Sequence, residues 1–320
     1  DAARRRQEDD RGNRQGDGSL SGPTGGPAAP QDVPAHLRRA ILSAHPDLAG
    51  AAFSVAGRGW HSLAIDVDGR LIFKFPKGEE ACAALRREAR LLAVVAPRLT
   101  MPVPRMTLHA GPPLFSVHDK LPGETLERAA YLRLGRKARD RLADDLALFF
   151  AELHALDPAA MREAGALPVG VWDTGEETLA PAWAPLPPDC AARARAALDA
   201  YRALGPDPLG ERYGFFDAHG WNMAFDPARQ RLDGIFDFAD SGVAPVHREF
   251  APVSLVDPDL TARTIRAYER LTGRLIDRRR VFLLTAAMRL SELAGEIETR
   301  GNVEWVTGLA VEWFSQDAVG

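Results

Sequence analysis

The chain has few cysteines and no long apolar segment. Its 320 residues include two cysteines, Cys82 and Cys190, which are too few for a disulfide framework or a four-thiolate zinc site. No apolar run reaches the roughly 20 residues that a membrane helix needs, and the first residues are polar rather than signal-like. These absences predict a protein that works in a reducing, cytoplasmic compartment and does not contact a membrane.

An excess of charge of one sign is also absent. Forty basic and 44 acidic side chains give a net charge of −4, so the chain has no overall basic field with which to hold nucleic acid. With 46% hydrophobic and 26% charged residues, it can bury a sizeable core. The length predicts two lobes, and we expect small-molecule partners; the oligomeric state stays open.

Lysine is the scarcest charged residue, with four lysines against 36 arginines. Where arginine supplies nearly every surface charge, a lysine inside an apolar strand suggests that the site needs a compact ammonium group. Lys74 has that position, in the sequence Leu-Ile-Phe-Lys-Phe at residues 71–75. A lysine whose stem only covers apolar surface is the alternative interpretation.

The hydrophobic pattern divides the chain into three parts. Residues 1–34 lack apolar periodicity and are rich in Gly, Pro and charge, which predicts a disordered tail. In residues 35–120 we expect helices at 35–45 and 79–95 and strands at 51–55, 62–66, 71–75 and 114–118, with a hairpin turn at Asp68-Gly69. In residues 121–320 we expect helices at 139–156, 190–204, 261–271 and 281–297, and short strands at 213–216 and 234–238.

Two carboxylates and an amide frame a predicted hairpin in the second half. Asp217 and Asn222 follow one short strand, and Asp237 lies fifteen residues after Asn222, between two phenylalanines. Phosphoryl transfer uses an Asp beside the acceptor hydroxyl, and oxygen ligands from an Asn and a second Asp to hold Mg²⁺ against phosphates. Asp217 and Asn222 could instead cap turns, but a carboxylate in an apolar strand is costly without a compensating cation or hydrogen bonds.

A second group of residues could hold phosphates. Gly57, Gly59 and Ser62 lie between two predicted strands, where glycine lets backbone approach a phosphate closely. Alone, this pattern indicates an ordinary turn. Lys74 on the next strand and Glu88 on the following helix complete a phosphate clamp in which the carboxylate anchors the lysine.

At these residues the chain resembles the aminoglycoside phosphotransferase family (choline kinase-like), which is related to the protein kinases. The similarity is carried by Gly-Arg-Gly-Trp at 57–60, Phe-Lys-Phe-Pro at 73–76, Leu-Pro-Gly at 121–123, Leu-His-Ala-Leu at 153–156, and the segments around Asp217 and Asp237. The resemblance implies an α+β, bilobal protein-kinase-like fold. It has a small antiparallel-sheet, nucleotide-binding lobe at 35–120 and a larger, mainly helical, catalytic and acceptor-binding lobe at 121–320.

The resemblance also implies an activity. The γ-phosphate of ATP or GTP would pass to a hydroxyl of a small molecule, with an aminoglycoside-type antibiotic as the first candidate, antibiotic resistance as a possible role, and another amino alcohol, sugar or macrolide as alternatives. Lys74 would contact nucleotide phosphates, Asp217 would orient or deprotonate the acceptor hydroxyl, and Asn222 with Asp237 would bind Mg²⁺.

Some positions depart from the family pattern. Phe215 and Phe216 replace the His and Gly before the catalytic Asp, Ala239 replaces a Gly, and Glu249 stands where the family has a downstream Asp. These departures support a second hypothesis, a nucleotide-binding, pseudokinase-like regulator with little turnover. The retained clamp lysine and metal ligands favour an active enzyme.

Acidic residues suggest where a cationic acceptor could bind. Glu292, Glu296 and Glu298 cluster on the helix predicted at 281–297 and the turn after it, and Asp240 lies three residues after Asp237. Charge complementarity would hold ammonium groups there, although a solvated helix face is the alternative. His219 matches no zinc spacing with Cys190 or His247, so we interpret it as structural.

Overall fold

The computed structural model describes residues 32–58 and 62–316. The predicted tail up to position 31 and the predicted phosphate-loop residue Gly59 lie outside the described residues. The described chain forms two compact units. The sheet unit contains the chain up to Val169 together with Pro206–Asp277, and the helical unit contains Gly170–Gly205 and the chain from Arg278 onward.

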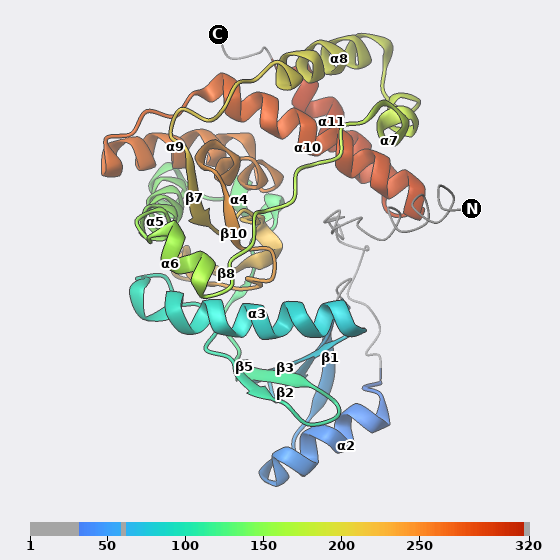
Figure 1. Ribbon diagram of the computed structural model, residues 1–320, viewed down its shortest axis with the longest axis vertical. Coiled ribbons are helices and arrows are strands. Elements are labelled where there is room, and N and C mark those ends of the chain that lie inside the picture. Colours follow the sequence, from blue (N-terminus) through green and yellow to red (C-terminus); the bar gives the residue numbers. More distant parts are fainter. Residues whose placement is uncertain (1–31, 59–61, 317–320) are drawn as a thin grey trace, which may run out of the picture. The chain divides into compact units, whose positions relative to one another are not determined.

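The sheet unit begins with a five-stranded antiparallel sheet of order β1-β2-β3-β5-β4. Its strands and the elements around them are α2 (Ala35–Ala44), η2 (Pro46–Leu48), β1 (Phe53–Arg58), β2 (Ser62–Val67), β3 (Leu71–Pro76), α3 (Glu79–Val95), η3 (Ala96–Arg98), β4 (Thr107–His109) and β5 (Phe115–Asp119). In Figure 1, α3 lies across this sheet. Asp68 and Gly69 both have positive φ, 55° and 66°, as the predicted two-residue hairpin turn requires.

Alternation along β3 separates the apolar core from the polar face. Phe73 and Phe75 are buried in a cluster with Leu37 and Ile41 of α2. Since successive strand residues point to opposite faces, Lys74 between them points to the face that α3 covers. The sheet therefore directs one ammonium group toward a helix.

The rest of the sheet unit is mainly helical, with two small sheets. In chain order it contains β6 (Glu124–Thr125), α4 (Arg128–Leu132), α5 (Arg136–His154), α6 (Pro158–Glu163), β7 (Glu211–Gly214), η5 (Gly220–Asn222), β8 (Met223–Asp226), β9 (Arg231–Ile235), β10 (Gly242–Pro245), η6 (Val246–Phe250), η7 (Pro252–Leu255) and α9 (Pro258–Thr272). Strands pair in the orders β6-β8-β9 and β10-β7. The buried face of α5 carries Phe149 and Phe150, whose rings contact Phe215, Phe238 and Phe250.

The helical unit consists of α7 (Glu176–Leu179), η4 (Ala180–Trp183), α8 (Pro188–Arg202), α10 (Arg278–Thr299) and α11 (Val303–Ser315). Its core includes Leu198, Leu290 and Leu293 together with Trp313 and Phe314 of α11. The aromatic residues of α11 thus serve mainly to fill this core.

The α+β class, with an antiparallel sheet followed by a mainly helical region, is confirmed. The predicted lobe boundary at residues 120 and 121 falls inside the sheet unit and stays a prediction. The short strands predicted at 213–216 and 234–238 extend too far, because β7 ends at Gly214 and β9 at Ile235. Phe216 and Asp237 have φ of 59° and 66°, a left-handed conformation that no strand residue adopts.

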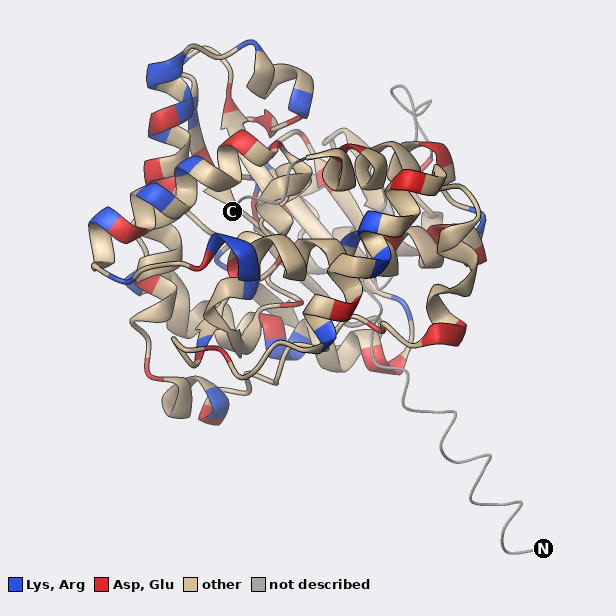
Figure 2. Ribbon diagram, turned by 90° about the horizontal axis from the view of Figure 1, so that it is seen from above, with Lys and Arg blue, Asp and Glu red and all other residues tan. Residues whose placement is uncertain are grey.

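Charges are mixed in sign over the described chain. Figure 2 shows Lys and Arg interspersed with Asp and Glu along the ribbon. Among the described helices, none has the length and apolar character needed to cross a bilayer.

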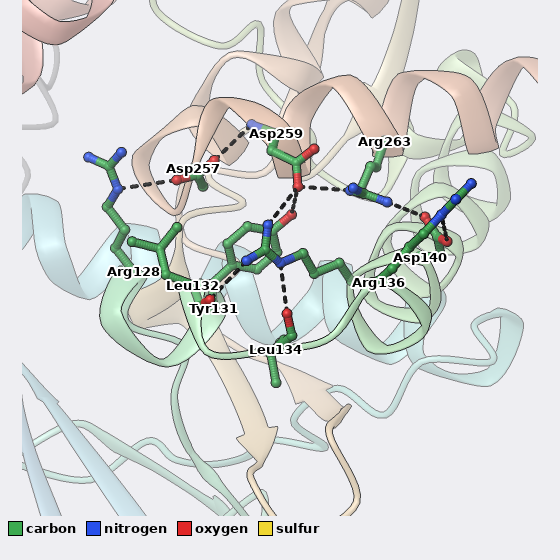
Figure 3. Close-up of polar contacts among 10 residues, drawn as sticks. Arg128, Tyr131, Leu132, Leu134, Arg136, Asp140, Asp257, Asp259 and Arg263 are labelled. Atoms are coloured by element: carbon green, nitrogen blue, oxygen red, sulfur yellow. Dashed lines mark hydrogen bonds and ion pairs between the residues drawn. The ribbon is translucent and has the colours of Figure 1, made fainter.

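A polar cluster joins α4, α5 and α9 (Figure 3). Asp259 accepts hydrogen bonds from the Tyr131 hydroxyl at 2.7 Å and from Arg263 Nε at 2.8 Å, and it lies 3.4 Å from Arg139 Nη1. Arg139 also donates to the carbonyl oxygens of Leu132 and Leu134. Burial raises the pKa of Asp259, but the hydrogen bonds from Arg263 and Tyr131 outweigh it, and the net pKa is lowered.

We predict that Asp259→Asn lowers the free energy of unfolding by about 1 kcal/mol at pH 7. Because the folded pKa of Asp259 is lowered, its contribution is present above the usual Asp pKa near 4 and disappears as pH falls through the lowered value. Urea unfolding should therefore show a difference that shrinks below about pH 4. Asp144→Asn is the control, since its ion pair with Arg270 joins the same two helices at an exposed site; an equal loss in both variants would contradict the prediction.

Candidate active site

Lys74 and Glu88 form an ion pair between β3 and α3. Lys74 Nζ lies 3.0 Å from Glu88 Oε2 and 3.3 Å from Oε1, so both carboxylate oxygens face the ammonium. The Glu88 side chain is 3% exposed and that of Lys74 15% exposed. Breaking a buried pair of this kind leaves an uncompensated charge, so the pair fixes α3 against the sheet.

Asp237 is a second carboxylate partner of the same ammonium group. Its Oδ1 lies 2.8 Å from Lys74 Nζ, although 163 residues separate the two in sequence. The Asp237 side chain keeps 46% of its surface exposed, so this carboxylate is open on one side. Lys74 is therefore shared between a buried carboxylate, Glu88, and an open one.

The three charges shift one another's pKa values. Burial lowers the pKa of Lys74, but the two carboxylates outweigh it and the net pKa is raised. For Asp237, burial raises the pKa, but Lys74 lowers it by more, so the net pKa is lowered. Burial raises the pKa of Glu88 against the opposing effect of Lys74. At neutral pH the ammonium and the Asp237 carboxylate are both ionised.

Glu88 also reaches the segment that follows β9. Its Oε1 accepts a hydrogen bond from the backbone N–H of Phe238 at 3.1 Å. Phe238 is fully buried against Phe149 and Phe215, and it directly follows Asp237. One carboxylate thus positions both the lysine and the backbone that carries Asp237.

Asp217 lies in the loop between β7 and η5. Its Oδ2 accepts a hydrogen bond from Asn222 Nδ2 at 2.7 Å, and its Oδ1 lies 3.3 Å from His219 Nε2. Its side chain is 24% exposed. Asp217 is therefore held in orientation on both oxygens while part of it still faces solvent.

Asn222 and Asp237 lie at one end of the β8–β9 hairpin. Met223 pairs with Ile235, and the backbone N–H of Phe236 donates to the Asn222 carbonyl at 3.0 Å. Since Asn222 Nδ2 faces Asp217, the side-chain oxygen of Asn222 points away from that bond. Asn222 and Asp237 each offer oxygen, the donor that Mg²⁺ prefers.

This oxygen set fits a magnesium ion that is shared with phosphates. No group of three or more His, Cys, Asp or Glu residues able to hold a metal occurs in the part of the chain that the structure describes. Mg²⁺ is commonly bound by one or two protein oxygens, with water and substrate phosphates completing its shell. A site of one amide and one carboxylate oxygen agrees with that pattern and not with a protein cage.

The remaining predicted phosphate contacts lie along β1 and β2. Gly57 is in β1, at a register irregularity between Val55 and Gly57, and Ser62 begins β2 opposite Pro76 of β3. Asp240 lies in the exposed turn that follows Phe238. Their predicted roles stay predictions.

The three acidic residues predicted to capture a cationic acceptor are all on α10 of the helical unit. Glu292 is buried beside Arg289, with Oε2 3.3 Å from Nη1. Glu296 is buried, and its Oε2 accepts a hydrogen bond from the Asn302 backbone N–H at 2.6 Å. Glu298 is exposed. The first two therefore already have structural contacts, and their acceptor role stays a prediction.

Two histidines close to Asp217 and Lys74 were not identified as functional from the sequence. His219, interpreted as structural, lies beside Asp217 and also helps to lower the pKa of Asp237. His118 of β5 pairs with Ile72 and so shares the sheet face of Lys74; burial and Lys74 lower its pKa. Side-chain alternation along residues 114–118, together with their pairing to the strand at 71–75, could have placed His118 on this face.

Comparison with known proteins identifies the family and the fold of this chain. The model of the phosphotransferase enzyme family, APH, matches residues 53–282. No curated protein sequence matches the chain. Solved structures of similar fold include the following three.

The first is the GDP complex of wild-type aminoglycoside 2'-phosphotransferase-IIIa, at 21% identity and a TM-score of 0.71, covering 88% of this chain and 98% of that one. The gentamicin complex of APH(2")-IIa has 17% identity and a TM-score of 0.63, covering 90% and 98%. Macrolide 2'-phosphotransferase type I has 17% identity and a TM-score of 0.59, covering 90% and 100%.

The fold is that of the kinase-like phosphotransferases. The chain belongs to the phosphotransferase enzyme family, which confirms the resemblance and the prediction that the protein is an enzyme.

We predict that Lys74→Ala lowers the free energy of unfolding by about 3 kcal/mol near pH 8, since it leaves the buried Glu88 carboxylate unpaired. Without Lys74, burial and the nearby Asp237 carboxylate raise the pKa of Glu88, opposed only by the Phe238 backbone hydrogen bond. Protonation of Glu88 then relieves the cost, so the deficit should shrink as pH falls toward 5. Urea unfolding at the two pH values measures this. The double variant Lys74→Ala/Glu88→Gln should recover much of the loss, and an unchanged stability in Lys74→Ala would instead support a lysine that only covers apolar surface.

Proposed function

We propose that this enzyme transfers the γ-phosphoryl group of ATP or GTP to a hydroxyl of a small molecule. The observation that carries the proposal is the convergence of Lys74, Asp237 and Glu88 on one contact, with Asp217 and Asn222 at the end of the adjoining hairpin. A purely structural ion pair needs no second, half-exposed carboxylate. A phosphate clamp beside a metal ligand does need one.

Lys74 would bind the nucleotide phosphates by changing partners. Its contact with Asp237 is the more solvent-exposed of its two ion pairs, so a phosphate can replace Asp237 while Glu88 continues to hold the ammonium. Glu88 keeps its hydrogen bond to the Phe238 backbone throughout. The lysine therefore stays in place when its partner changes.

Asp217 would act on the acceptor hydroxyl. Asn222 and His219 orient its two oxygens. The carboxylate would accept the proton that leaves the acceptor hydroxyl as the hydroxyl oxygen attacks phosphorus. A magnesium ion, when bound with the nucleotide, would neutralise phosphate charge. Asn222 and Asp237 would hold that ion, and release of Asp237 from Lys74 would make its carboxylate available.

We propose an aminoglycoside-type antibiotic as the leading acceptor, and antibiotic resistance in the cytoplasm as the corresponding role. Support comes from the similar structures, which include an aminoglycoside phosphotransferase in complex with gentamicin and another in complex with GDP. A macrolide is the second candidate, since macrolide phosphotransferases share the fold. Another amino alcohol or a sugar fits the same chemistry. Of the acidic residues proposed for a cationic acceptor, Asp240 and Glu298 are exposed.

A nucleotide-consumption screen tests this proposal. Each of ATP and GTP would be incubated with aminoglycosides, macrolides, choline-like amines and sugars, with a no-acceptor reaction as control. We expect consumption that depends on one acceptor class, and a polycationic acceptor should lose affinity in high salt. Nucleotide binding without acceptor-dependent consumption would favour the pseudokinase-like regulator.

We predict that Asp217→Asn keeps the fold and the nucleotide affinity but lowers kcat by about 10² or more, since positioned acid-base help is lost. Steady-state kinetics and calorimetric titration of the nucleotide measure the two effects. Asp226→Asn, at the other end of β8, is the control, because its side chain is 20% exposed and accepts hydrogen bonds from the backbone of its own turn. Turnover like that of the wild type in Asp217→Asn would rule out this residue as the catalytic carboxylate.

We further predict that nucleotide binding depends on Mg²⁺, because phosphates and two protein oxygens share the ion. Asp237→Ala should remove this dependence. In EDTA the variant should bind nucleotide at least as tightly as the wild type, since Lys74 loses its competing carboxylate; in Mg²⁺ it should bind more weakly. Calorimetry of both proteins in both conditions gives four affinities, and a wild-type affinity that EDTA leaves unchanged would contradict the metal assignment.

A further inference from the structure

Below the loop that carries Asp217, a buried carboxylate binds two consecutive backbone amides. Glu249 is fully buried. Its Oε2 accepts a hydrogen bond from the Phe215 N–H at 3.1 Å, and its Oε1 accepts one from the Phe216 N–H at 2.7 Å. Asp217 is the next residue. The backbone that leads into Asp217 is therefore fixed by both oxygens of one side chain.

This backbone adopts a conformation that it would not keep on its own. Phe216 has a φ of 59°, in the left-handed region that a bulky side chain disfavours. Phe216 is 6% exposed, so packing and the Glu249 contact together must hold it. Loss of the contact would let Phe216 relax toward an ordinary conformation and would turn Asp217.

The space for the Glu249 carboxylate depends on a glycine. A Cβ added at Gly214, the last residue of β7, would collide with Glu249 Oε2 and would lie 2.8 Å from the Phe216 ring. The carboxylate thus occupies a cradle that any other residue at position 214 would close.

A histidine and a tyrosine extend the contact away from the loop. His154, at the end of α5, is 2% exposed; its Nε2 lies 3.2 Å from Glu249 Oε2, and its Nδ1 lies 2.9 Å from the Tyr268 hydroxyl. Tyr268 of α9 is fully buried. The chain of contacts runs from α9 through α5 to the Asp217 loop, inside the sheet unit.

The direction of each hydrogen bond follows from the donors available. The Glu249 carboxylate already accepts two amides, so His154 Nε2 must carry the hydrogen between them. With that hydrogen on Nε2, Nδ1 is the accepting nitrogen of the ring, so the Tyr268 hydroxyl donates to it. Burial raises the pKa of Tyr268, which keeps that hydrogen in place. In this series of contacts, from Tyr268 through His154, each donor therefore points toward Glu249.

We propose that His154 is a positioning residue for phosphoryl transfer: oriented by Tyr268, it donates from Nε2 to Glu249 and so fixes the backbone that aims Asp217. This inference rests on the proposed function, because the aim of Asp217 matters only if that residue acts on the acceptor. His154 touches neither the proposed nucleotide contacts nor Asp217 itself. Its effect must therefore fall on kcat and not on nucleotide binding.

The test compares His154→Leu with His154→Gln, because the Gln amide keeps a donor near the Nε2 position and Leu does not. In His154→Leu we expect kcat to fall about tenfold to 10²-fold, the scale of a misaimed catalytic group, with nucleotide Kd unchanged; His154→Gln should recover most of it. Gly214→Ala should resemble His154→Leu. Tyr268→Phe should lower kcat less, and Tyr131→Phe, which also loses one buried hydroxyl contact, should leave kcat at the wild-type value.

Amide hydrogen exchange supplies a readout that does not need turnover. The Phe216 N–H should exchange about tenfold faster in His154→Leu than in the wild type, and near the wild-type rate in His154→Gln. If the wild type transfers no phosphate to any acceptor, the proposed function fails, and the exchange rates alone decide whether His154 holds the loop. If His154→Leu does not fold, Tyr268→Phe and Gly214→Ala carry both measurements.

Three results would overturn the proposal. The first is a kcat in folded His154→Leu equal to that of the wild type. The second is an equal fall in Tyr131→Phe, which would indicate a general loss of stability. The third is an unchanged Phe216 exchange rate.

Discussion

The arrangement of the sheet unit depends on one ammonium group held between two carboxylates of unequal burial. Glu88 is buried and Asp237 is half exposed, and Lys74 lies between them at 3.0 and 2.8 Å. Because the Glu88 contact would be costly to break and the Asp237 contact is open to solvent, the lysine has one permanent and one exchangeable partner. The same buried carboxylate fixes the backbone of Phe238, so β3, α3 and the end of β9 are joined at a single point.

From that point the geometry of the other functional residues follows. The β8–β9 hairpin places Asn222 beside the segment that leads to Asp237, and Asn222 holds Asp217. Two of the backbones involved, at Phe216 and Asp237, are left-handed. Left-handed residues that are not glycine concentrate at functional sites, because surrounding contacts must stabilise them; here Glu249 and Lys74 provide those contacts.

Much of this fold can be predicted from hydrophobic spacing. The helix predicted at residues 79–95 coincides with α3, and those at 35–45 and 281–297 match α2 and α10 within three residues at each end. Short elements such as β6 and β8, of two and four residues, give no periodic signal and are missed. The left-handed Phe216 and Asp237 are not predictable either. Phe disfavours that conformation and Asp adopts it in only a minority of cases, so the surrounding contacts decide.

The candidate site likewise has a part that the sequence predicts and a part that only the structure shows. The residue types and order of Lys74, Glu88, Asp217, Asn222 and Asp237 are enough to predict a phosphate clamp and a metal pair. The second partner of Lys74 lies 163 residues away, and the function of Glu249 as a clamp on two amides depends on a cradle at Gly214. Neither contact leaves a local pattern in the sequence, so only the structure can identify them.

The most direct test of the account is phosphorus-31 NMR of the enzyme with nucleotide, Mg²⁺ and each acceptor class. The account predicts a phosphomonoester resonance on one acceptor, formed in a one-to-one ratio with nucleoside diphosphate and absent without enzyme. Release of inorganic phosphate alone, or no acceptor-dependent phosphomonoester with any class, would contradict the assignment of Lys74, Asp217, Asn222 and Asp237 to phosphoryl transfer.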